Sequence, residues 1–118
     1  MLLVNAVILF AIGAVAGLTM AAMHFRRRSK PRALVAITHG IFAAGGLATL
    51  VWTVVKMGGD HGVQIALALF LVAATGGFTL LSFHLRGRVL PSALIVGHGL
   101  VAVTAFIVLL LSAVALGA

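Results

Sequence analysis

Four long apolar stretches, separated by short polar connections, dominate the hydrophobic pattern of the chain. They run from about Leu2 to Phe25, Ala33 to Val55, Gly62 to Leu85 and Ser92 to Gly117, and none contains Asp, Glu, Lys or Arg. About twenty apolar residues are needed to cross the roughly 30 Å hydrocarbon core of a bilayer. Continuous apolarity is typical of membrane helices, because transmembrane strands alternate polar and apolar positions. The pattern therefore predicts an all-α membrane protein with four transmembrane helices.

The connections near 26–32, 56–61 and 86–91 are short, so consecutive helices should be antiparallel neighbours. We expect an up-down four-helix bundle that forms one transmembrane domain over residues 1–118. The composition agrees, since 64% of the residues are hydrophobic and only 8% are charged. Soluble domains average roughly a quarter charged residues, so a soluble core could not bury this much apolar surface.

The positive charges are distributed unevenly. Seven of the eight Lys and Arg residues lie in or beside the first and third connections. Loops rich in Lys and Arg stay cytoplasmic, so we expect both termini and the middle connection on the outer side of a bacterial-type inner membrane. The net charge of +7 is then explained by orientation and by the anionic headgroups of the lipid bilayer. Nucleic acid is not an expected partner, and Trp52 is expected to anchor the outer interface.

An internal repeat is the most informative feature of the sequence. At an offset of sixty, residues 17–36 align without gaps with residues 77–96, and eight of twenty positions are identical, namely Gly, Thr, His, Arg, Arg, Pro, Ala and Leu. The repeat predicts a duplicated helical hairpin, with repeat 1 at about 1–58 and repeat 2 at about 59–118. Two such halves should be related by a pseudo-twofold axis along the membrane normal.

Several kinds of chemistry lack the residues they need. The chain has no Cys, which excludes disulfides, Cys-held iron–sulfur clusters and covalently attached c-type heme. The one carboxylate side chain is Asp60, and the sequence has neither a Gly-rich phosphate loop nor an HExxH pair. Hydrolytic catalysis is therefore not expected, whereas noncovalent heme binding is compatible with the composition.

Each repeat carries two histidines within its helices. His24 and His84 precede the basic connections, whereas His39 and His98 lie eight and seven residues beyond the prolines, Pro31 and Pro91. At about 1.5 Å per residue the second pair lies roughly 10 to 12 Å inside the helices. Ionisable side chains within a spanning helix usually face the bundle interior and mark function. His39 and His98 are therefore the stronger ligand candidates.

Two inward imidazoles are suited to the two axial positions of a heme iron, whose porphyrin supplies four ligands. Zinc or copper would require more protein donors. We expect one or two heme b groups, with two slightly favoured, held by His39 with His98 and by His24 with His84. Pairing within one hairpin stays open, and two hemes only about 12 Å apart would be crowded. The one-residue slip between His39 and His98 would rotate one imidazole by about 100° from strict symmetry.

Simpler roles exist for the same histidines. His39 and His98 could form helix-to-helix hydrogen bonds, and His24 and His84 could be solvated at the membrane surface.

Glycines and arginines near the histidines complete the candidate site. Gly17 and Gly77 lie seven residues before His24 and His84, about two turns away on the same face. Glycine has no side chain that would keep a flat porphyrin off the helix, and three more glycines adjoin the deep histidines: Gly40, Gly97 and Gly99. Four arginines at the cytoplasmic mouth would pair with heme propionates: Arg26, Arg28, Arg86 and Arg88.

In its architecture and in the four histidines His24, His39, His84 and His98, the chain resembles the four-helix membrane b-type cytochromes, which include cytochrome b561-like proteins. The resemblance implies noncovalent heme b, bis-histidine ligation and electron transfer, commonly with a quinone. The b561 pattern has hemes near opposite membrane faces. Here every helical histidine is expected in the cytoplasmic half, so the resemblance does not extend to a complete transmembrane electron path.

Together these features predict a membrane electron carrier rather than an independent enzyme, which exchanges electrons with a quinone or a partner redox protein at the cytoplasmic side. The alternative is a non-redox accessory or assembly subunit of a larger membrane complex, and either role is compatible with a homo-oligomer. Small multidrug-resistance transporters share the length and the four helices. They depend on a membrane-embedded Glu in the first helix, which this chain lacks.

Overall fold

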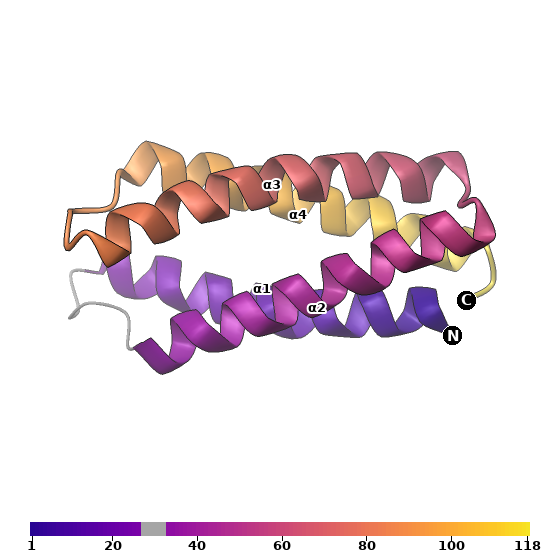
Figure 1. Cartoon of the computed structure of the whole chain (residues 1–118), viewed down its shortest axis with the longest axis horizontal. Helices are drawn as coiled ribbons and strands as arrows, with labels where there is room; N and C mark the ends of the chain where they lie inside the picture. The colour runs from indigo at the N-terminus through magenta and orange to yellow at the C-terminus, as the bar shows by residue number, and fades with distance from the viewer. Residues whose placement is uncertain (27–32) are drawn as a thin grey trace.

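The computed structural model describes residues 1–26 and 33–118, and its helices form an up-down four-helix bundle (Figure 1). The helices are α1 (Leu2–Phe25), α2 (Ala33–Met57), α3 (His61–Leu85) and α4 (Ser92–Ala115). The bundle measures 42 × 19 × 19 Å. All four helices are long and apolar enough to cross a membrane, which confirms the predicted all-α class and the four long apolar helices.

Glycines allow the tight connections between these helices. Gly58 and Gly59, between α2 and α3, have φ values of 77° and 51°, a left-handed region that glycine adopts without steric cost. Asp60 follows them as the N-cap of α3, and its side chain accepts a hydrogen bond from the Gly62 backbone N–H. Gly87, just after α3, also has a positive φ of 65°. The chain therefore reverses within a few residues.

The bundle consists of two hairpins. α1 packs closely against α2, and α3 packs closely against α4, whereas the contacts of α1 with α4 and of α2 with α3 are fewer. Both termini lie at one end of the bundle, and the end of α1, the start of α2 and the connection at 86–91 lie at the other (Figure 1). α1 faces α3 across one diagonal, and α2 faces α4 across the other. Side chains on the inner faces therefore meet between the hairpins.

Small side chains, larger aliphatic side chains and one aromatic pair form the core. Ala6, Ala66 and Ala105 are fully buried, and such small residues allow membrane helices to approach closely. The rings of Phe10 and Phe70 stack across the α1–α3 diagonal, with centroids 3.8 Å apart and planes within 2° of parallel. Large apolar side chains remain exposed on the outside of the bundle. An apolar exterior of this kind suits lipid as the solvent.

The two hairpins bury corresponding residues. Phe10 and Phe70, sixty residues apart on α1 and α3, occupy the same core cluster. On α2 and α4 the correspondence runs at an offset of fifty-nine instead: Leu50 and Leu109 are both fully buried. The offset changes because the connection between the helices is one residue shorter in the second hairpin.

Candidate functional site

The two deep histidines face each other across the bundle. His39 comes from α2 and His98 from α4, each six residues after its helix begins, or about 9 Å along the axis. Their ring centroids are 6.2 Å apart, and the ring planes are nearly perpendicular at 83°. Helices that belong to different hairpins therefore bring the two imidazoles together at equal depth.

Each imidazole is held by a backbone carbonyl of the neighbouring helix in its own hairpin. His39 Nδ1 lies 2.8 Å from the Gly13 oxygen, and His98 Nδ1 lies 2.7 Å from the Ala73 oxygen. A carbonyl oxygen can only accept, so each Nδ1 must carry the donated proton. In a neutral imidazole the remaining nitrogen, Nε2, then has its lone pair available. Metal-ligating histidines usually show this arrangement.

Gly17 and Gly77 provide the space in which these rings lie. A Cβ atom added at Gly17 would lie 3.1 Å from His39 Cε1 and Nδ1, and one added at Gly77 would lie 3.1 Å from His98 Cε1. The sequence suggested that both glycines admit a flat cofactor beside His24 and His84. The structure packs them instead against the deep imidazoles, because α1 and α3 present these positions to α2 and α4.

The two deep histidines are structurally equivalent, contrary to the rotation of about 100° expected from their one-residue slip. Their Nδ1 atoms bond to carbonyls exactly one repeat apart, Gly13 and Ala73. The shorter second connection shifts the whole of α4 by one residue relative to α2. The one-residue difference therefore does not fall within α2 or α4, and both histidines occupy the same position in their helices.

The other glycines lie apart from the histidine pair. Gly40 and Gly97 are exposed, and Gly99 is partly exposed. A Cβ atom at any of the three would meet no atom of the described residues within 4 Å. The structure therefore gives no packing reason for a glycine at these positions.

The shallow histidines have separate surroundings. His24 Nε2 lies 3.2 Å from the Ser92 hydroxyl at the start of α4, and its ring packs edge-on against Phe25. His84 lies in the last turn of α3 and is partly buried. Within residues 1–26 and 33–118, no ring contact joins His24 to His84. The structure therefore pairs the deep histidines but not the shallow ones.

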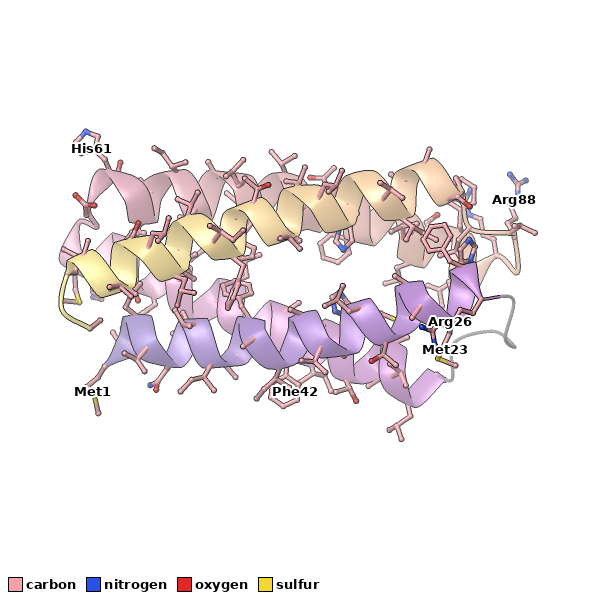
Figure 2. The ribbon with its side chains drawn as sticks, turned by 180° about the vertical axis from the view of Figure 1, so that it is seen from behind. Met1, Met23, Arg26, Phe42, His61 and Arg88 are labelled. Carbon is pink, nitrogen blue, oxygen red and sulfur yellow. The ribbon has the colours of Figure 1, made fainter. Side chains whose placement is uncertain are left out.

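The arginines lie at the end of the bundle nearest the histidines. Arg26, Arg86 and Arg88 are exposed there, opposite the end that carries Met1 and His61 (Figure 2). Arg28 was also expected at this mouth, and it lies outside the described residues. The end with the arginines thus combines positive charge with the shorter path to His39 and His98.

Sequence reasoning missed the partners of the imidazoles and the aromatic pair of the core. Phe10 and Phe70 precede Gly13 and Ala73 by three residues, on the side away from the arginines. The Phe10 ring lies against Gly46 of α2, seven residues, or about two turns, beyond His39. The sixty-residue offset could have matched Phe10 with Phe70. It could not have shown that their rings meet, because this depends on how the hairpins pack.

The donor set is limited to imidazoles. Among the residues that the structure describes, no group of three or more His, Cys, Asp or Glu side chains could hold a metal ion. Two imidazoles from this described part of the protein are therefore the donors available at His39 and His98.

No family model, no curated protein and no solved structure matches this chain.

Proposed function

We propose that the protein is a membrane-embedded b-type cytochrome in which His39 and His98 hold heme b. The observation that carries the proposal is the paired geometry of these residues. Both Nδ1 atoms are taken by carbonyls of the neighbouring helix, and the two rings face each other with centroids 6.2 Å apart. The function would be electron transfer, with a quinone or a partner redox protein as the exchange partner.

The two imidazoles come from different hairpins and lie close together, with ring centroids 6.2 Å apart. His39 and His98 would be the residues that hold a central ion between the hairpins. Helix–helix contacts are few between the hairpins, which is where a flat group held by α2 and α4 would lie. The donors and the architecture are therefore compatible with bis-histidine ligation.

A bound heme, held by His39 and His98, would supply a one-electron redox couple. The Gly13 and Ala73 carbonyls would fix the tautomer and orientation of the imidazoles and raise their basicity. The Phe10 and Phe70 rings, with the surrounding apolar side chains, would keep water from the outer half of the bundle. Exposed Arg26, Arg86 and Arg88 would bind carboxylates in charge-assisted pairs at the opposite side.

The proposal also includes the orientation of the protein in the membrane. The two similar hairpins suggest a duplicated unit, and the clustered arginines suggest that their end is cytoplasmic in a bacterial-type inner membrane. Electron exchange would then occur on the cytoplasmic side, because the histidines lie nearer that end. A second heme at His24 and His84 stays a prediction, which the heme-to-protein ratio tests.

An accessory or assembly subunit without a cofactor is the second candidate. It is favoured by the same hydrogen bonds, since His39 and His98 each join the two helices of one hairpin. In that role Nε2 would have no function, and an Asn at either position would be an adequate substitute, because the Asn amide can donate from a position close to that of Nδ1.

This difference defines the experiment. His39→Asn and His98→Asn retain a donor to the carbonyl but cannot ligate iron from the Nε2 position, whereas His39→Ala removes both functions. We expect wild-type protein from heme-replete cells to contain heme, both Asn variants to lose it while remaining inserted and helical, and His61→Ala, at the far end, to keep it. Full heme content in the Asn variants would refute the ligand assignment, and a colourless wild-type protein would favour the accessory role.

A further inference from the structure

The outer face of α2 carries a shallow apolar groove. The groove is largely open, with a volume of about 460 Å³, and its lining residues are all apolar: Ala44, Leu47, Ala48, Val51, Trp52 and Val55. It extends over eleven residue steps, or about 16 Å of helix, which is close to half of the roughly 30 Å hydrocarbon core of a bilayer. Its length therefore matches the acyl chain of one lipid leaflet.

The repeat shows how this groove arises. At the offset of fifty-nine that relates α2 to α4, the small Ala44 and Ala48 correspond to Val103 and Ile107. Val103 and Ile107 are themselves exposed, at 45% and 50%, so on α4 the corresponding surface carries branched side chains. The same helix positions thus carry alanines in the first hairpin and branched side chains in the second.

The polar end of the groove carries a positive charge that is also specific to the first hairpin. Lys56 lies one turn beyond Trp52, with Nζ 4.9 Å from the centroid of the indole ring. On α4, Leu111 corresponds to Trp52 and the uncharged Ala115 corresponds to Lys56. Asp60, the one carboxylate side chain of the chain, caps α3 through Gly62. The groove is therefore lined by apolar side chains, and the ammonium group of Lys56 lies near the end that Trp52 lines.

We propose that this groove is a binding site for one anionic phospholipid, whose acyl chain lies along Ala44 and Ala48 and whose phosphate pairs with Lys56. Trp52 lies between the two parts, and tryptophan side chains favour the headgroup level of a membrane. A cation near the surface attracts acidic lipids, whereas an apolar groove alone would not distinguish lipid headgroups. This inference does not depend on heme binding.

The chain contains its own reporter, because Trp52 is its single tryptophan. The protein is reconstituted in phosphatidylcholine vesicles that contain a small, equal fraction of either brominated phosphatidylglycerol or brominated phosphatidylcholine, and quenching of tryptophan fluorescence is measured. We expect the anionic lipid to be enriched at Trp52 about fivefold, the factor that corresponds to about 1 kcal/mol for one basic residue near the surface. The arginines at the other end of the bundle do not affect this local signal.

Three variants test the two parts of the site. Lys56→Gln should make quenching by the two lipids equal, and Lys56→Arg should preserve the preference. The double variant Ala44→Val and Ala48→Ile, which copies the residues of α4, should reduce quenching by both lipids. An unchanged preference in Lys56→Gln, or unchanged quenching in the double variant, would overturn the proposal. Weak quenching of the wild type by both lipids would also overturn it and indicate that a second copy covers the groove.

Discussion

Replacing Gly17 by Ala should disturb the position of the His39 ring while leaving the stability of the protein almost unchanged. The new Cβ would lie 3.1 Å from His39 Cε1 and Nδ1, so the ring would have to move by a few tenths of an ångström. That movement weakens the bond from Nδ1 to Gly13, whose net contribution is about 0.5 to 1.5 kcal/mol. Alanine within a helix is favoured over glycine by roughly 0.5 to 1 kcal/mol. The two effects nearly cancel, so stability should change by less than about 1 kcal/mol.

Heme retention should respond much more strongly, because it requires His39 to remain opposite His98. We expect Gly17→Ala and Gly77→Ala to lose most of their heme, measured as the pyridine hemochrome per protein, with little change in the denaturation midpoint. Gly40→Ala is the matched control, since its Cβ would meet no atom within 4 Å among the described residues. If Gly17→Ala retained full heme content, Gly17 would not position the ligand, and this reasoning would be refuted.

Three further predictions concern the core, the ligand geometry and the topology. Phe10→Ala should destabilise the bundle by about 3 to 5 kcal/mol, measured by denaturant titration in detergent, because its ring stacks on Phe70 at 3.8 Å; a change below about 1 kcal/mol would contradict this packing. The ferric protein should give a highly anisotropic low-spin EPR signal, since the imidazole planes are 83° apart, whereas an ordinary rhombic low-spin signal would show that the rings reorient toward parallel planes. In this Cys-free chain, Met57→Cys should react with an impermeant maleimide on intact cells and Val89→Cys only after permeabilisation; the reverse pattern would invert the proposed orientation.

The helices were predictable from sequence because each apolar run ends at charged or turn-forming residues. The expected first span, Leu2 to Phe25, agrees with α1, and the ends of the other three spans differ by no more than two residues. The third span starts one residue earlier than expected because Asp60 caps the helix. The equal depth of His39 and His98 was also predictable, since it depends only on helical rise beyond each connection.

The contacts of the site could not be predicted in the same way. Gly17 was assigned to His24 by spacing along one helix, yet it packs against His39 on the next helix. That contact depends on the register between α1 and α2, which the intervening connection sets. The equivalence of His39 and His98 likewise depends on the length of the two connections. The alignment at an offset of sixty ignores that difference in length, and so it predicted a rotation between the two rings that the structure does not have.

The most direct test of the proposed function is the absorption spectrum of the detergent-purified protein, recorded after air oxidation and again after reduction with dithionite, with a pyridine hemochrome count. A strong Soret band, a sharp α band on reduction and one heme per chain would agree with ligation by His39 and His98. Two hemes per chain would add the site at His24 and His84. A spectrum without these bands, from protein produced in heme-replete cells, would contradict the central claim.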